Sequence, residues 1–208
     1  MKLAVFDFDS TLMDGETIDS LARAQGVYDE VSNITHRAME GELDFYESLK
    51  ARVALLQGMS LSLAQEVAHS LPLMEGAREC VRALQNAGYT TLCFSGGFHL
   101  ATDYFSEILN LSGSFANILH HKNGALTGEV GGEMMFSDSK GVMLSRLQKI
   151  LSITPQNTIA IGDGANDLSM FAYASTRVAF CAKSVLRAAA THCIERKDLR
   201  EVVSALAL

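Results

Sequence analysis

The sequence predicts an α/β protein with a doubly wound, mostly parallel sheet and a helical bundle inserted after the first strand. From Glu75 onward, short apolar runs of strand length alternate with segments of helical periodicity, which is typical of a parallel sheet with helices on both faces. Between residues 16 and 70, by contrast, no segment has the pattern of a strand. We therefore expect a catalytic core of residues 1–14 and 73–208 and a helical cap of residues 15–72.

Composition and charge limit the partners that this protein can have. The 208 residues are 48% hydrophobic and 20% charged, as in an ordinary globular protein, and the formal net charge is −7 with no basic run. Nucleic acid and anionic membranes both select clusters of Lys and Arg, so neither is an expected partner. A small anionic substrate is compatible with this charge, because a metal ion and a few placed cations invert the local field.

The cysteines and the first residues bear on the compartment. None of the four cysteines has C-x-x-C spacing, which favours buried, reduced thiols: Cys80, Cys93, Cys181 and Cys193. The first apolar run ends at Asp7, too early for a secretory signal, and no run approaches the ~18 apolar residues of a membrane span. We expect a cytoplasmic protein, and the sequence does not indicate its oligomeric state.

The first strand is expected over residues 2–6, and two acids follow it. An apolar run of this length predicts a strand buried on both faces. Asp7 and Asp9 then point the same way as the strand ends. Two carboxylates so close repel each other and are costly to desolvate, which favours a divalent cation beside them, Mg²⁺ first. The alternative at this point is that the acids only begin a turn or cap a helix.

The inserted region is expected to form a bundle of four helices. Apolar and polar residues mix at helical spacing over residues 16–25, 28–40, 44–57 and 62–70. Glycines separate these segments, and Pro72 closes the region. Active sites of open α/β folds lie at the carboxyl ends of strands, so an insertion directly after the first strand lies beside such a site.

The remaining elements alternate along the chain. The glycine-rich stretch 124–136 predicts one or two hairpins. Periodicity predicts helices over 75–87, 98–110, 140–151, 166–174 and 184–190 and at the C-terminus, and strands over 90–94, near 115–121, over 158–161 and 178–181, and near 192–195.

Ser95-Gly96-Gly97 comes where the strand over 90–94 is expected to give way to a helix. Two glycines let the backbone approach a ligand closely, a helix start presents free N–H groups to an anion, and a hydroxyl adds a donor. This stretch is therefore a candidate phosphate-binding loop. Taken alone, it is equally compatible with an ordinary turn.

Lys140 follows Ser137-Asp138-Ser139, which we interpret as a helix cap, so this lysine stands in the first turn of its helix. A cation there opposes the helix macrodipole. A residue placed against local preference is a candidate functional residue. The alternative is a solvated surface lysine.

Gly162-Asp163-Gly164-Ala165-Asn166-Asp167 follows the strand over 158–161. Asp163 falls at the strand end, as Asp7 does, and Asp167 falls in the first turn of the next helix, where an acid suits the dipole. The stretch is a candidate half of a metal site.

These four features fall at loops that can meet over one edge of the sheet. Together they supply the functional groups that phosphoryl transfer through an aspartyl-phosphate requires. In such a reaction a carboxylate attacks, Mg²⁺ and a lysine neutralise the phosphoryl oxygens, and a second acid handles the proton of the leaving group.

With these motifs together, the chain resembles the haloacid dehalogenase superfamily, which implies a Rossmann-like core. The resemblance extends over residues 1 to about 203 and rests on Asp7-Phe-Asp-Ser-Thr-Leu, Ser95-Gly-Gly-Phe, Lys140 and Gly162-Asp-Gly-Ala-Asn-Asp. Residues outside these motifs are similar to the branch that hydrolyses O-phospho-L-serine: Glu16-Thr-Ile-Asp, Ala38-Met-Glu-Gly, Phe45, Arg52 and Ala179-Phe-Cys-Ala-Lys183. That branch completes serine biosynthesis.

The resemblance implies the chemical roles. Asp7 is expected to be the nucleophile, and Asp9 to protonate the departing serine oxygen and then to deprotonate the hydrolytic water. Mg²⁺ is expected to bind the Asp7 carboxylate, the Asp9 backbone carbonyl and Asp163, with Asp167 supporting the site. The phosphoryl group is expected to lie against Ser95, the Gly96 N–H, Lys140 and Asn166.

The resemblance also assigns the cap a part in recognising the substrate. O-phosphoserine carries an ammonium and a carboxylate beside its phosphate, and an acid facing an arginine fork can bind that pair. Glu16 and Arg52 are expected to do so, with Met39 and Phe45 at the pocket wall. Pattern alone is equally compatible with a first-turn acid, a solvated arginine and two core residues.

Two alternatives differ in what happens to the phosphate. In the first, the same chemistry acts on another small phosphomonoester or transfers the phosphoryl group to an acceptor alcohol such as homoserine. In the second, the chain is a non-enzymatic signalling receiver, which also uses clustered acids, a hydroxyl and a lysine on a doubly wound sheet. The inserted cap, the length and the second acid two positions after the first speak against a receiver.

Overall fold

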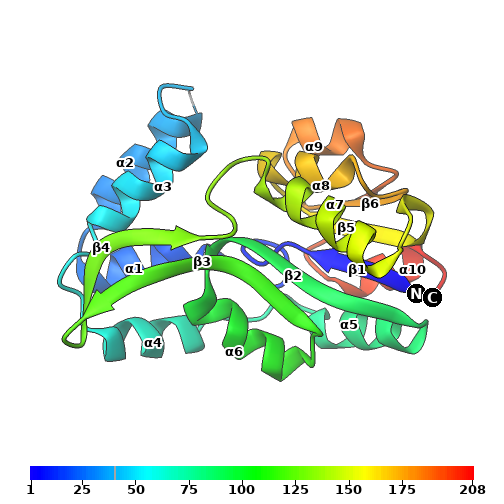
Figure 1. Ribbon diagram of the computed structural model, residues 1–208, viewed down its shortest axis with the longest axis horizontal. Coiled ribbons are helices and arrows are strands. Elements are labelled where there is room, and N and C mark those ends of the chain that lie inside the picture. Colours follow the sequence, from blue (N-terminus) through cyan, green and yellow to red (C-terminus); the bar gives the residue numbers. More distant parts are fainter. Residues whose placement is uncertain (40) are drawn as a thin grey trace.

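The computed structural model describes residues 1–39 and 41–208, and its framework is one sheet. The strands run in the spatial order β4-β3-β2-β1-β5-β6-β7 (Figure 1). Every neighbouring pair is parallel except β3 and β4, which form an antiparallel hairpin. The strands are β1 (Lys2–Phe6), β2 (Tyr89–Phe98), β3 (Gly113–Lys122), β4 (Ala125–Gly132), β5 (Thr158–Gly162), β6 (Thr176–Phe180) and β7 (His192–Ile194).

Helices cover both faces of this sheet, which confirms the predicted doubly wound α/β class. They are α1 (Thr17–Gln25), α2 (Tyr28–Met39), α3 (Phe45–Ala54), α4 (Leu61–His69), α5 (Ala77–Asn86), α6 (His99–Leu109), α7 (Ser139–Leu151), α8 (Leu168–Phe171), α9 (Ser184–Ala189) and α10 (Arg200–Ala205), with short 3₁₀ turns η1 (Pro155–Asn157) and η2 (Ala165–Asp167). None of the helices in this described part of the chain has the length and hydropathy needed to span a bilayer.

The central strand β1 is buried on both faces because its side chains alternate between two cores. Leu3 and Val5 pack into a cluster with residues of α7, α8 and α9. Ala4 and Phe6 pack on the opposite face with residues of α5, α6 and α10. This period-two alternation fixes the register of β1 between β2 and β5, and therefore the place at which its carboxyl end emerges.

Helices α1 to α4 share a third cluster, which also takes in residues of the β3–β4 hairpin. The chain enters and leaves this region at adjacent points. The N–H of Asp14 donates to the carbonyl of Pro72 at 2.9 Å, and Met13 forms a β-bridge with Leu73. Figure 1 shows α2 and α3 standing apart from α7, α8 and α9. That residues 15–72 form a separate cap stays a prediction.

Two predicted boundaries were wrong in ways that bear on the site. The strand expected to end at residue 94 continues through Ser95-Gly96-Gly97 to Phe98, and its pairing with β3 shifts register between Phe94 and Phe98. Glycines often mark such irregular strand positions. The helix expected over 166–174 is replaced by η2 and the four-residue α8, because Asp167 is tied back to the preceding loop.

The cysteines are only partly as predicted. All four are free; Cys80 and Cys93 are buried, but Cys181 and Cys193 are exposed. Cys181 comes after the end of β6 with a positive φ of 45°, and Cys193 lies in β7 at the edge of the sheet. Apolar strand-like sequence therefore did not guarantee burial at the sheet edge, where one flank has no neighbouring strand.

Candidate active site

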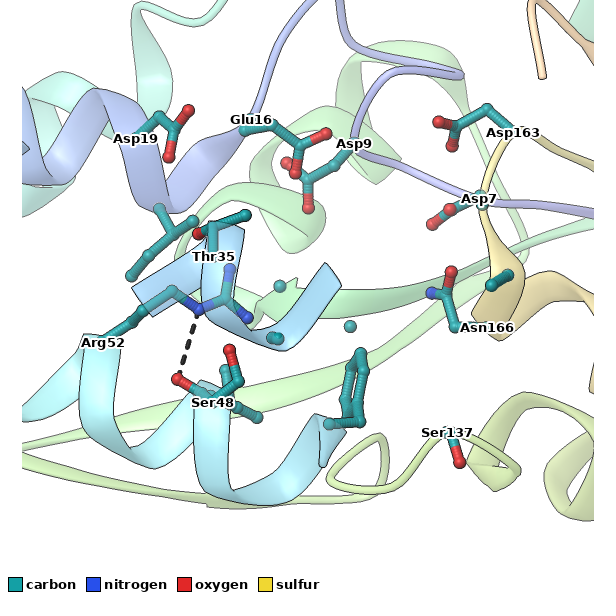
Figure 2. A pocket seen from close by; sticks show the side chains of 18 of the residues that line it. Asp7, Asp9, Glu16, Asp19, Thr35, Ser48, Arg52, Ser137, Asp163 and Asn166 are labelled. Carbon is teal, nitrogen blue, oxygen red and sulfur yellow. Dashed lines mark hydrogen bonds between the residues drawn. The ribbon is translucent and has the colours of Figure 1, made fainter. Parts of the chain in front are cut away.

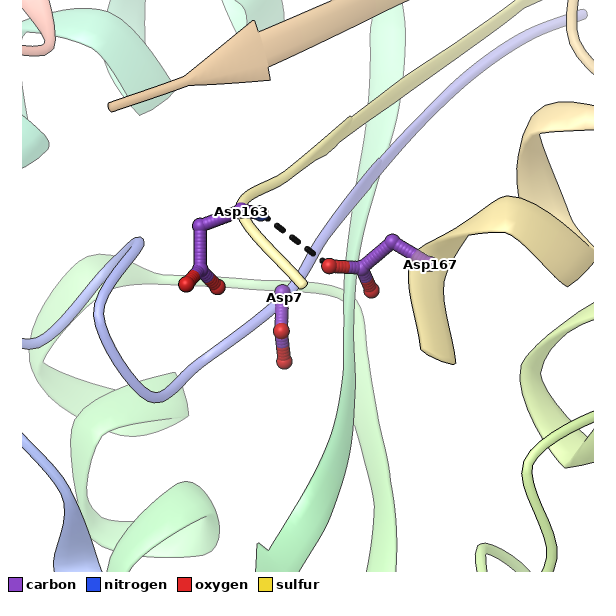
Figure 3. A group of neighbouring side chains, drawn as sticks. All are labelled: Asp7, Asp163 and Asp167. Atoms are coloured by element: carbon purple, nitrogen blue, oxygen red, sulfur yellow. Dashed lines mark hydrogen bonds between the residues drawn. The ribbon is translucent and has the colours of Figure 1, made fainter. Parts of the chain in front are cut away.

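The site begins where β1 ends. The N–H of Asp7 donates to the carbonyl of Ile161 at 2.9 Å, so the ladder between β1 and β5 extends one residue beyond the strand. This anchors the Asp7 backbone and leaves its carboxylate at the carboxyl edge of the sheet, where the residue is only 5% exposed. Its oxygen lies within 4.8 Å of carboxylate oxygens of Asp163 and Asp167 (Figure 3).

The loop after β5 holds the other two acids in place. The N–H groups of Asp163 and Gly164 both donate to Oδ2 of Asp167, at 3.1 and 2.9 Å. A Cβ at residue 162 would collide with that same carboxylate, so glycine is required for this close approach. The fully buried Asp167 thus organises the loop, and the Asp163 carboxylate is left facing Asp7.

Lys140 is not a solvated surface residue. Its Nζ lies 2.6 Å from Oδ1 of Asp7 and 2.6 Å from Oδ1 of Asp167, and the residue is only 2% exposed. It stands in the first turn of α7 as predicted, after the N-cap Asp138, whose side chain makes no capping hydrogen bond. Burial pushes the pKa of Lys140 down, but Asp167 and Asp7 outweigh it and raise the pKa above its usual value.

One lysine does not balance three neighbouring acids. Burial and, next, the Asp167 carboxylate raise the pKa of Asp7 well above its usual range, against the opposing effect of Lys140. Burial and Asp167 likewise raise the pKa of Asp163 to about 6. The group is thus short of positive charge and consists of carboxylate oxygens, the donors that a hard divalent cation such as Mg²⁺ takes. These residues fit such an ion.

The Asp9 carboxylate is turned toward different partners. Its Oδ1 accepts from the Thr17 N–H at 2.7 Å and from the Thr17 Oγ1 at 2.6 Å, while the Ser95 hydroxyl donates to Oδ2 at 3.4 Å. Burial raises the pKa of Asp9, and the bonds from Thr17 only partly offset this. A carboxyl group held with a raised pKa beside a reacting group is suited to general acid–base work. Sequence reasoning assigned no role to Thr17, although it stands in the stretch Glu16-Thr-Ile-Asp that carries the family resemblance.

The glycines of β2 give the neighbouring groups room. The Gly97 N–H donates to the Ser95 hydroxyl at 2.9 Å. A Cβ at residue 97 would lie 2.6 Å from Oδ2 of Asp9, and one at residue 96 would lie 3.0 Å from Cζ of Phe45. Side chains at either position would therefore displace the acid or the aromatic ring.

A cavity of about 790 Å³ opens over these residues, within the range usual for small-molecule sites. Figure 2 shows Asp7, Asp163 and Asn166 on one side of it and Arg52 and Asp19 on the other. The predicted site residues that line it are Asp7, Asp9, Glu16, Phe45, Arg52, Gly96, Asp163 and Asn166. Ser95, Lys140 and Asp167 lie beneath, and the side chain of Met39 and the whole of residue 40 lie outside the described residues.

Glu16 and Arg52 are held by their own neighbours. Oε1 of Glu16 accepts from the Ser10 hydroxyl at 2.8 Å, and Nε of Arg52 donates to the carbonyl of Ser48 at 3.2 Å. Desolvation in the pocket and, next, the Asp9 carboxylate raise the pKa of Glu16 to about 8. Desolvation lowers the pKa of Arg52. An acid and an arginine thus line the cavity together, and desolvation makes the charged form of each costly in free energy.

Four further residues at the site had been given no role from the sequence. Ser10, with a positive φ of 57°, orients Glu16. Asp19, Ser137 and Lys183 line the cavity. Ser10, Asp19 and Lys183 stand within stretches that carry the family resemblance, and Ser137 stands within the expected helix cap, but no role had been predicted for any of them.

A family comparison agrees with this geometry. Residues 1–175 match the model of the haloacid dehalogenase-like hydrolases. The chain belongs to this family.

Full-length relatives narrow the class. The chain is 62% identical over 206 residues to a phosphoserine phosphatase of Wolinella succinogenes, covering 99% of this chain and all of the relative. It is 46% identical to a phosphoserine phosphatase of Methanocaldococcus jannaschii, over 97% and 96% of the two chains. A solved structure of a phospho-aspartyl intermediate analogue of phosphoserine phosphatase superposes with a TM-score of 0.93 at 46% identity, covering 98% of each chain.

Proposed function

We propose that this protein hydrolyses O-phospho-L-serine to L-serine and phosphate through a phospho-aspartyl intermediate on Asp7, the last step of serine biosynthesis. The observation that carries the proposal is the buried Asp7, paired with Lys140 at 2.6 Å at the floor of a cavity whose opposite wall carries an acid and an arginine. The relatives and the solved structures named above support this substrate and this intermediate. A cytoplasmic location stays a prediction.

The reaction would have two steps on the same carboxylate. An oxygen of Asp7 attacks phosphorus, the bond to the serine oxygen breaks, and that oxygen takes a proton from Asp9. Asp9, now ionised, removes a proton from a water that attacks phosphorus of the acyl phosphate. The bond from phosphorus to Asp7 breaks, phosphate leaves, and both acids return to their starting states. The raised pKa of Asp9 supports its starting role as the acid.

The charge of the phosphoryl oxygens needs several partners. Mg²⁺ held by the Asp7 carboxylate, the Asp9 backbone carbonyl and Asp163 would supply electrostatic stabilisation of these oxygens. Asp167 would support the site through the loop that it organises.

Protein donors would complete the phosphoryl site. Lys140 is already placed at Asp7, and we assign it, with Ser95, the Gly96 N–H and Asn166, to the phosphoryl oxygens. Because Lys140 and Ser95 are buried and already hold their partners, we expect little reorganisation of these two groups during the reaction.

The ammonium and carboxylate of the substrate would be bound on the opposite side of the cavity. Glu16 would bind the ammonium and Arg52 the carboxylate, with Phe45 and Met39 at the wall. Helices α1 to α4 would form a cap that excludes water during attack, as lids commonly do. The presence of one acid and one arginine among the residues that line the cavity supports this assignment.

The test is phosphate release from a panel of esters, each with Mg²⁺ and with EDTA. Phosphoserine, phosphothreonine, phosphoethanolamine and p-nitrophenyl phosphate separate the contributions of the amino-acid groups. We expect metal-dependent release with a strong preference for phosphoserine. Metal-dependent release without a preference for phosphoserine would be consistent with the mechanism but would reject phosphoserine as the specific substrate. A second assay with added homoserine tests whether the phosphoryl group is transferred to an alcohol.

The receiver alternative finds no support. The chain belongs to a hydrolase family, and its acids open into a cavity large enough for a small molecule. No release from any ester of the panel would reopen this alternative.

A further inference from the structure

One cation at the mouth of the cavity has no role in the reaction described so far. Lys183 follows β6 in the loop before α9, at the same carboxyl edge of the sheet as the acids. Its N–H donates to the carbonyl of Asp163 at 3.0 Å, and its side chain lines the cavity yet stays exposed. Within residues 1–39 and 41–208, its ammonium has no ion-pair partner.

The charges around the cavity are unfavourable for an anion. Five carboxylates line it, from Asp7, Asp9, Glu16, Asp19 and Asp163, and among the described residues the only lysine or arginine side chains that line it are Arg52 and Lys183. Arg52 lies across the cavity and is assigned to the substrate carboxylate, while Lys140 is occupied by two acids. A phosphate dianion that approaches from solvent on the side of Asp163 therefore meets Lys183 as its one unpaired cation.

We propose that Lys183 is a steering residue, which attracts the phosphate dianion of substrate and product to the mouth of the cavity and takes no part in making or breaking bonds. The proposal rests on the proposed function for the identity of its ligand as a phosphate ester. A lysine suits this task because its ammonium is a compact, hydrated charge on a flexible stem.

The expected effect of Lys183 on the affinity for phosphate follows from Coulomb's law. A dianion about 7 Å from a unit charge in a high dielectric gains enough attraction for an affinity change of about fivefold at low ionic strength. Salt at 0.15 M has a Debye length of about 8 Å and should remove most of this gain. A residue that only supported the loop would show no such salt dependence.

The test is calorimetric titration of the full-length protein with inorganic phosphate in the presence of Mg²⁺, at about 10 and 150 mM salt. We expect Lys183→Met to weaken binding about fivefold at low salt and only about twofold at high salt, and Lys183→Arg to retain the wild-type affinity. The matched control is Lys149→Met, an exposed lysine in the last turn of α7, at the opposite end of that helix from Lys140. It makes the same change in net charge and should leave binding unchanged.

Three outcomes would overturn the proposal. In the first, Lys183→Met and Lys149→Met change the affinity for phosphate equally. In the second, the loss of affinity in Lys183→Met is the same at low and at high salt. In the third, the wild-type protein does not bind phosphate. Lys183→Gln serves as a second neutral variant if thermal melting shows that Lys183→Met is poorly folded. Because the titration needs no turnover, failure of the phosphoserine assay rejects the proposed function separately from this inference.

Discussion

The cavity has two walls that are built differently. The strand-edge wall carries Asp7 and Asp163, and the buried Lys140 and Asp167 support them from behind through polar contacts of 2.6 to 3.1 Å. The helical wall consists of Glu16, Asp19 and Arg52. Glu16 is exposed and accepts a hydrogen bond from Ser10, while Arg52 donates to the carbonyl of Ser48. Chemistry requires groups that are fixed before the substrate arrives, whereas recognition tolerates groups that the substrate itself brings together.

If the strand-edge wall does the chemistry, Asp7→Asn should have the largest effect. The amide keeps the shape of the carboxylate but is a poor nucleophile, so we expect turnover of phosphoserine to fall by about 10³-fold or more. Initial-rate assays of phosphate release measure this. Asp29→Asn, on the exposed start of α2, is the matched control and should keep wild-type activity. Wild-type-like turnover in the Asp7 variant would refute the mechanism.

Lys140→Met should have the next largest effect, which we expect on the free energy of unfolding. Removing this ammonium leaves Asp7 and Asp167 buried without their partner, a loss that costs about 3–5 kcal/mol in such pairs. Urea unfolding without metal should report this loss, and Mg²⁺ should restore part of it. Lys149→Met should unfold like wild type. A metal-free stability equal to wild type would mean that the three acids do not depend on Lys140.

Arg52→Ala should affect recognition and spare folding. Loss of a charge-assisted hydrogen bond of about 2 kcal/mol predicts that kcat/KM for phosphoserine falls about 30-fold. Phosphoethanolamine lacks the carboxylate, and its kcat/KM should change less than about threefold. Lys50→Ala, an exposed cation on the same helix α3, provides the control. Equal losses of kcat/KM for both esters would show that Arg52 does not bind the substrate carboxylate.

The smallest expected effect is that of Glu16 on the pH dependence of kcat/KM for phosphoserine. Its pKa of about 8 in the free protein means that it is mostly neutral below pH 8, yet only the carboxylate attracts an ammonium. Since kcat/KM reports the free enzyme, this ratio for phosphoserine should rise about fivefold between pH 7 and 8 and level off above. Glu16→Gln should lack the rise, as should the phosphate ester of 3-hydroxypropionate, which has no ammonium. A rise that persists in Glu16→Gln would belong to another group.

The strand-edge wall was more accessible to sequence reasoning than the helical wall. Parallel strands bring their carboxyl ends to one edge, so acids that follow β1 and β5 could be expected to meet before any contact was known. Lys140 stood out because it opposes the dipole of α7. The structure places all of these side chains together.

The helical wall depends on details that periodicity does not carry. Asp9 is oriented by Thr17, and Glu16 by Ser10, through a loop whose path requires a positive φ at Ser10. The length of β2 was underestimated for a related reason, because glycines that usually end a strand here make room for Asp9 and Phe45. Lys183 stands in a stretch that carries the family resemblance, but no role was predicted for it, and its place in the cavity is what suggests one.

The central claim is that phosphorus is transferred to Asp7, and a single-turnover experiment tests it most directly. Wild-type protein is mixed with ³²P-labelled phosphoserine and Mg²⁺, quenched in acid within milliseconds, and digested for peptide mapping. We predict an alkali-labile label on the N-terminal peptide that contains Asp7, and no label on Asp7→Asn. Label on another residue, or phosphate released at every time point without any labelled protein, would contradict the account.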